Sequence, residues 1–87
     1  MSELPERWAT VGRAVLEARE ALGMTQAELA RRSGVSDPIV RRIERGTVAN
    51  YRANVLVKIE AALGWPAGTI TRMVNGPRPA TKLPKAG

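Results

Sequence analysis

Three arginines recur at helical spacing in the middle of the chain, at Arg41, Arg42 and Arg45. At about 100° per residue, their side chains share one face of a helix, while Val40 and Ile43 fall on the opposite face. A guanidinium donates through a planar fork that fits a phosphate or the O6 and N7 edge of guanine. Three such cations repel each other unless a polyanion or counterions neutralise them. The pattern therefore indicates a polyanionic partner, and the alternative is a solvated basic face.

The charge of the whole chain supports the first of these interpretations. The 87 residues contain 14 Lys and Arg against 8 Asp and Glu, a net charge of +6 with a pI near 11.1. Residues 31–52 are strongly basic, whereas the five glutamates of residues 1–30 outnumber the arginines there. A positive charge concentrated in one short stretch is typical of proteins that bind nucleic acid.

The composition argues against an enzyme. The chain has no Cys and no His, so thiolate chemistry, imidazole bases and the usual zinc ligands are absent. The carboxylates of Glu17, Glu20 and Glu28 lie among helical charges, without the acidic cluster that a metal-dependent nuclease needs. We therefore expect no enzymatic activity, no cofactor and no metal. The polar start of the chain and the lack of a long apolar run predict a cytoplasmic, nucleoid-associated protein that does not enter membranes.

The length allows one domain, and the apolar period predicts that it is all-α. Trp8, Val11, Val15, Ala18 and Leu22 predict a first helix from about residue 6 to 22, ended by Gly23. Thr25 and Glu28 form a capping-box pattern that predicts a second helix starting at Gln26.

A third helix is expected over about 37–45. Ser36 and Asp37 are both candidate caps, and Asp37 is favoured because proline disfavours helical geometry in the residue before it. Two further helices are expected over about 53–63 and from Trp65-Pro66 to Asn75. We assign residues 1–75 to the domain and expect 76–87, with Arg78, Lys82 and Lys85, to be a flexible, basic, proline-rich tail. A basic arm that contacts DNA is the alternative for this tail.

The second and third helices are joined by a short connection containing Gly34 and Val35, which is typical of a helix-turn-helix. Residues 11–74 resemble the phage-repressor and Cro-like (XRE-type) helix-turn-helix domains. The similar stretches, in the family's order and spacing, are Arg19-Glu20-Ala21-Leu22-Gly23-Met24-Thr25-Gln26, Ala27-Glu28-Leu29-Ala30, Gly34-Val35-Ser36, Ile43-Glu44-Arg45-Gly46, Leu56-Val57-Lys58-Ile59 and Ala62-Leu63-Gly64. The resemblance implies a compact, five-helix, lambda-repressor-like domain.

The resemblance also implies roles for individual residues. Gln26 matches a phosphate-binding glutamine at the start of the second helix, and Arg19 and Glu44 match a structural ion pair. The residues that it places on DNA are Gln26, Ser36, Asp37, Pro38, Ile39, Arg41, Arg42, Arg45, Tyr51 and Arg52. Within this set, Arg45, Tyr51 and Arg52 would hold the backbone, and Arg41 and Arg42 would read most of the sequence.

The pair Asp37-Pro38 departs from the family's commoner pattern of amide and hydroxyl side chains. Aspartate could accept from cytosine N4, or it could only cap the helix. We favour the cap. Ile39 is then a candidate for contact with a thymine methyl group.

The function expected from these features is that of a sequence-specific, double-stranded-DNA-binding transcription regulator, a Cro/C1-type, phage-like repressor with the helix at about 37–45 in the major groove. A single reading helix buries little surface, so we expect a homodimer, with Trp65, Ile70 and Met73 of the fifth helix as its candidate surface. Closure of the monomer core is the alternative role for those three residues. The alternative function is a protein-interaction module on the same scaffold, antitoxin-like or polymerase-binding, with an acidic protein as partner.

Overall fold

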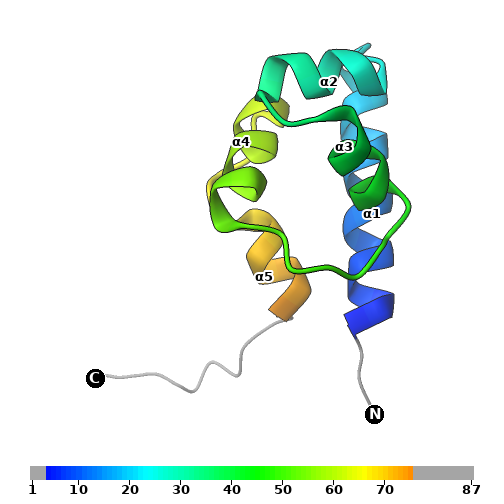
Figure 1. Cartoon of the computed structure of the whole chain (residues 1–87), viewed down its shortest axis with the longest axis vertical. Coiled ribbons are helices and arrows are strands. Elements are labelled where there is room, and N and C mark those ends of the chain that lie inside the picture. The colour runs from blue at the N-terminus through cyan, green and yellow to red at the C-terminus, as the bar shows by residue number, and fades with distance from the viewer. Residues whose placement is uncertain (1–3, 76–87) are drawn as a thin grey trace.

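Five α-helices follow one another in the part of the chain that the computed structural model describes, residues 4–75 (Figure 1). They are α1 (Leu4–Ala21), α2 (Gln26–Ser33), α3 (Asp37–Glu44), α4 (Ala53–Leu63) and α5 (Thr69–Asn75). No strand occurs in this part. The all-α, five-helix prediction is therefore confirmed. The predicted tail, 76–87, lies outside the described residues.

The longest helix, α1, packs against both α3 and α5, while α2 packs against α3 and α4. In Figure 1, the start of α1 and the end of α5 lie at the same end of the molecule. A hydrogen bond of 3.4 Å from Arg7 Nη1 to the Val74 carbonyl joins these two ends. The helices thus enclose one core, and α3 lies on its outside. None of the described helices combines the length and the apolar character that a membrane crossing requires.

The core is almost entirely aliphatic, as the low aromatic content predicts. Its buried side chains are Trp8, Val11, Val15, Met24, Leu29, Ala30, Val35, Val40, Ile43, Leu56, Ile59, Leu63 and Ile70. The prediction that Leu22 belongs to the buried face of the first helix is wrong, since Leu22 is 52% exposed. The helix ends at Ala21, so the pattern of buried positions does not extend to Leu22.

The predicted capping box at the start of α2 is confirmed. Thr25 Oγ1 accepts from the Glu28 amide at 3.0 Å, and Glu28 Oε1 accepts from the Thr25 amide at 2.8 Å. The Thr25 amide hydrogen bond lowers the pKa of Glu28, because it favours the ionised carboxylate. Gly34, in a left-handed conformation at φ +75°, ends the helix. These two local signals set both the start and the length of α2.

The cap of α3 differs from the one that we favoured. Ser36, with extended backbone angles, is the N-cap residue, and Asp37 is the first residue of the helix. The Ser36 side chain makes no capping hydrogen bond, and its carbonyl instead accepts the amides of Ile39 and Val40, both at 3.1 Å. Proline is tolerated in the first turn of a helix, where an amide has no helical partner. With Pro38 in the first turn, Asp37 is a helical residue and the cap is Ser36, one residue before the cap that we favoured.

A buried glutamate that the sequence did not single out sets the position of α5. The carboxylate of Glu60, only 1% exposed, accepts from the amides of Gly68 at 2.9 Å and Ile70 at 2.7 Å. These amides lie at the start of α5, where helical donors need partners. Glu60 thereby ties the last described helix to α4.

Candidate nucleic-acid interface

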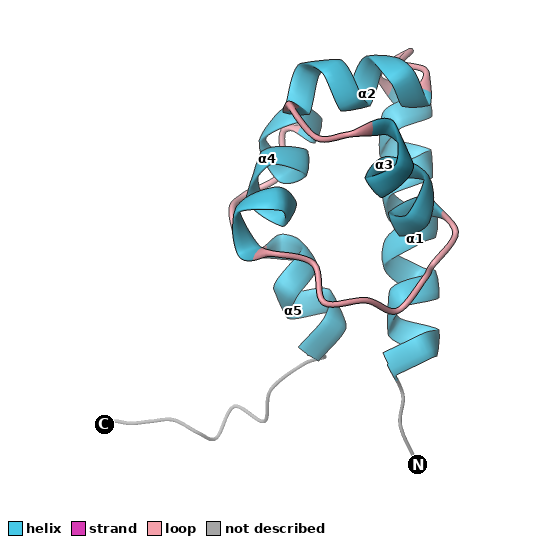
Figure 2. Cartoon of the chain, viewed as in Figure 1, coloured by secondary structure: helices cyan, strands magenta, loops and turns pink. Residues whose placement is uncertain are grey.

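The arginines of α3 point away from the core. Arg41, Arg42 and Arg45 are exposed, whereas Val40 and Ile43 are completely buried. We call these three side chains the arginine face. Figure 2 shows α3 on the outside of the bundle, after the short turn that follows α2. The sequence-based assignment of an apolar face and an arginine face to this helix thus agrees with the structure.

The guanidinium groups of the arginine face are weakly tied to the protein. Arg41 lies 3.8 Å from Asp37, between Nη2 and Oδ2, which is too long for a hydrogen bond. Within residues 4–75, Arg42 and Arg45 form neither an ion pair nor a side-chain hydrogen bond. Most of the donors on this face are therefore available to a partner.

Four of the candidate residues line one hollow of about 260 Å³ beside α3. Ile39 and Arg42 come from the helix, and Tyr51 and Arg52 come from the loop before α4. We call this the cationic hollow; its remaining lining residues are Ala49, Asn50 and Val55. Asn50 is a polar residue that the sequence analysis left in a loop without a role. The position of Asn50 next to Tyr51 and close to Arg52 was the one indication in the sequence that it lies at this site.

Tyr51 is held by the protein itself. Its ring packs against Trp8, with centroids 4.9 Å apart and planes at 55°, and its hydroxyl donates to the Thr47 carbonyl at 2.9 Å. Burial raises the pKa of Tyr51, and the positive charges of Arg42 and Arg45 act in the opposite direction. Because the hydroxyl proton is already donated to the Thr47 carbonyl, the direct contribution of Tyr51 is to fix the loop beside α3.

Arg19, Glu44 and Gln26 form a buried cluster behind α3. Arg19 binds the Glu44 carboxylate twice, from Nε to Oε2 at 2.6 Å and from Nη2 to Oε1 at 3.1 Å. Its Nη1 donates to the Met24 carbonyl at 2.8 Å, and Gln26 Nε2 donates to Glu44 Oε1 at 2.8 Å. The hydrogen bonds to Glu44 raise the pKa of Arg19 above its ordinary value despite the opposing effect of burial. This ion-pair cluster joins α1, α2 and the end of α3.

The contact between Gln26 and Glu44 was not anticipated. Gln26 is half-buried at the first position of α2, and one of its amide protons is bound by Glu44. A side-chain amide has two N–H donors, so one remains for another acceptor. The ion-pair cluster thus orients this amide at the N-terminus of α2.

A close approach of two backbones holds α3 against α1. A Cβ atom on Gly12 would lie 2.5 Å from the carbonyl oxygens of both Ile43 and Glu44. Gly46, at φ +76°, is similarly close to Ala9, whose Cα would be 2.8 Å from an added Cβ. The sequence offered no sign that Gly12, inside a helix, has this role, because the close contact depends on residues more than 30 positions away.

The remaining candidates lie at the start of α3. Ser36 and Pro38 are exposed, and Asp37 is half-buried with Oδ1 lacking a hydrogen-bond partner among the described residues.

Arg52, the N-cap residue of α4, is exposed and makes no capping bond through its side chain. Its guanidinium therefore adds to the positive charge near Arg42.

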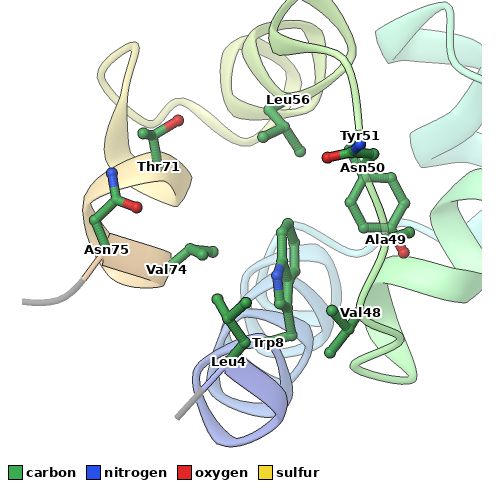
Figure 3. A pocket seen from close by; sticks show the side chains of 10 residues that line it. All are labelled: Leu4, Trp8, Val48, Ala49, Asn50, Tyr51, Leu56, Thr71, Val74 and Asn75. Carbon is green, nitrogen blue, oxygen red and sulfur yellow. The ribbon is translucent and has the colours of Figure 1, made fainter. Parts of the chain in front are cut away.

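The surface predicted for the fifth helix is only partly available, and Trp65 lies before α5, which begins at Thr69 rather than at Trp65-Pro66. Ile70 is completely buried and closes the monomer core, while Trp65 and Met73 are partly buried against it. The accessible apolar feature is instead a groove of about 490 Å³ at the end of α5, in which Trp8 stands between Leu4, Val48, Leu56 and Val74 (Figure 3). We call this the apolar groove.

The comparison with known families agrees with this geometry. The helix-turn-helix family model matches residues 15–66, which is more than half of the chain. The chain belongs to this family, the Cro/C1-type or XRE-type helix-turn-helix proteins, whose domain is of the DNA-binding, transcription-regulator type. No curated protein and no solved structure matches the chain significantly.

Proposed function

We propose that this protein is a sequence-specific regulator of transcription that acts as a repressor by occupying its DNA site. In this proposal α3 enters the major groove, where Arg41 and Arg42 contact base edges and Arg45 contacts the DNA backbone. The observation that carries the proposal is the exposure of Arg41, Arg42 and Arg45 on a helix whose other face is fully buried. A helix about 10–12 Å across fits a groove about 12 Å wide.

The phosphate contacts come from groups around α3. Arg52 and Asn50 in the cationic hollow offer donors on one side of the helix. On the other side, Gln26 offers its second amide proton at the N-terminus of α2, where the helix dipole favours an anion. Contacts to the backbone on both sides of the reading helix would fix its register in the groove.

We propose further that two copies bind an inverted repeat. A single module of this kind buries roughly 600–1,000 Å² on DNA, and half-sites one helical turn apart are separated by about 34 Å. The apolar groove is the surface offered to the second copy, because α5 contributes Val74 and Asn75 to it and Leu4 and Val48 remain 42% and 46% exposed at its edge. The proposed location is the cytoplasm, on the nucleoid.

Selection of binding sites from random duplexes tests the proposed function. We expect enrichment of a palindromic motif, and binding that weakens by about 0.9 log unit per log unit of salt for each phosphate contact. Sedimentation of the free protein and of the protein on one selected site would give the number of copies bound. If the true partner is an acidic protein, the selection should enrich no motif, and the chain should bind all duplexes with equal affinity.

A further inference from the structure

The acidic residue at the start of α3 has no role in capping that helix. The amides of Ile39 and Val40 already donate to the Ser36 carbonyl at 3.1 Å, and Pro38 has no amide proton. The Asp37 carboxylate therefore finds none of these donors. Its Oδ1 is buried and has no hydrogen-bond partner within residues 4–75, so the oxygen of this partly exposed side chain that is open to a partner is Oδ2. A negative charge is thus kept on an otherwise basic surface without a hydrogen bond that would explain it.

This carboxylate lies next to an arginine of the arginine face. Asp37 and Arg41 are one helical turn apart, so their side chains share one side of α3. Their closest atoms, Oδ2 and Nη2, are 3.8 Å apart, and the side chains are 39% and 59% exposed. Because this distance exceeds that of a hydrogen bond, an acceptor on Asp37 and the donors on Arg41 both stay available.

We propose that Asp37 and Arg41 act as one unit that reads a cytosine and a neighbouring guanine in the major groove. This inference rests on the proposed function and specifies part of the sequence that is read. Arg41 donates its fork to guanine O6 and N7, and Asp37 accepts from cytosine N4. Their polar ends are 3.8 Å apart, similar to the separation of about 3.4 Å between stacked bases, so the two side chains can reach adjacent bases.

The chemistry of the base edges selects cytosine for Asp37. Thymine and guanine present acceptor oxygens in the major groove, which repel a carboxylate. The N6 donor of adenine lies between two acceptors, its own N7 and thymine O4, whereas the N4 donor of cytosine has an acceptor on one side only, the guanine O6. The same charge repels phosphate, so Asp37 lowers affinity for DNA of the wrong sequence while allowing the correct one.

The experiment compares motifs selected from random duplexes by the wild-type chain and by Asp37→Asn. Asparagine donates and accepts, which fits the N6 and N7 atoms of adenine. We expect the variant to change one preferred base from cytosine to adenine, leave the other positions unchanged, and bind the wild-type site on the order of 10-fold more weakly. Asp37→Ala should lose the preference at that position alone. Glu20→Gln, which removes an exposed charge from α1, is the matched control and should enrich the wild-type motif.

The outcomes separate this inference from the function on which it rests. A wild-type chain that enriches no motif would overturn the proposed regulator and this reading with it. A wild-type motif that Asp37→Asn and Asp37→Ala leave unchanged, or weaken uniformly at every position, would overturn the reading alone. The unfolding midpoint of each variant, measured in urea, excludes loss of folded protein as the cause of a changed motif.

Discussion

Arg19 and the arginine face carry the same chemical group in opposite settings. Every nitrogen of the Arg19 guanidinium donates to a protein oxygen, in a site where its side chain is 10% exposed. Arg42 and Arg45, a few residues from Glu44, are exposed and form no ion pair within residues 4–75. The difference separates an arginine that builds the fold from arginines that the fold presents, and it is set by whether a carboxylate on a neighbouring helix is within reach.

Breaking the buried side of this comparison should have the largest effect. Arg19→Met leaves the Glu44 carboxylate buried without its ionic partner, and we expect a loss of about 3–5 kcal/mol in the free energy of unfolding. Urea unfolding followed by circular dichroism would measure it. Changing both residues, as Arg19→Met with Glu44→Leu, should recover much of the loss because no unpaired charge remains. A double variant as unstable as the single one would contradict this account of the ion-pair cluster.

Moving the arginine face without changing its charge is a second test. Gly12→Ala places a methyl group against the Ile43 and Glu44 carbonyls, so α1 and α3 must separate. We expect a destabilisation of about 1–3 kcal/mol, the usual cost of overpacking. Gly23→Ala is not a suitable control, because its φ of +74° adds strain. Ala14→Gly, at a half-buried position of the same helix, gives a reference for the change in helix propensity alone. Without the close contact, Gly12→Ala should stabilise the chain by about as much as Ala14→Gly destabilises it, and that result would argue against the contact.

Removing one cation from the exposed side should leave the fold intact. Arg42→Ala is expected to weaken binding to the selected site by about 1–3 kcal/mol and to relax one base position, with little change in unfolding free energy. Gln26→Ala should instead weaken binding to all sequences alike, as loss of a phosphate contact does. Fluorescence anisotropy on selected and random duplexes measures both. Equal losses on the two duplexes for Arg42→Ala would show that it does not read a base.

The smallest expected effect concerns the start of α2, away from both arginine sites. Because hydrogen bonding lowers the pKa of Glu28 in the folded chain, its carboxylate stabilises the fold above its unfolded pKa of about 4.3. This contribution is lost as the pH falls through the lower folded value. Glu28→Gln should therefore flatten the dependence of the unfolding free energy on pH in that range. An unchanged pH profile would contradict the role of the ionised carboxylate in the capping box.

The features predicted well from the sequence were those with local causes. The capping box at Thr25 and Glu28 and the two faces of α3 both depend on residues within one or two helical turns. The structure also contains the ion pair of Arg19 and Glu44, which the family resemblance implied over a separation of 25 residues. That resemblance supplied long-range information that periodicity does not contain.

The features that the sequence did not reveal depend on packing between distant segments. In the sequence, Gly12 resembles any glycine that weakens a helix, because its close contact with the carbonyls of α3 exists only in the folded chain. Glu60 resembles a surface charge in the sequence, but in the folded chain its carboxylate is buried and accepts hydrogen bonds from the amides of Gly68 and Ile70. The cap at Asp37 was wrong for a local reason, since the proline rule that favoured it is a tendency that the first turn of a helix can override.

The salt dependence of binding to one selected duplex and its scrambled counterpart tests the central claim most directly. If the arginine face reads DNA, the protein should bind the selected duplex more tightly than the scrambled one at every salt concentration. Both affinities should fall steeply as the salt concentration rises. Equal affinities for the two duplexes, with little dependence on salt, would contradict the claim that this face of α3 reads a sequence.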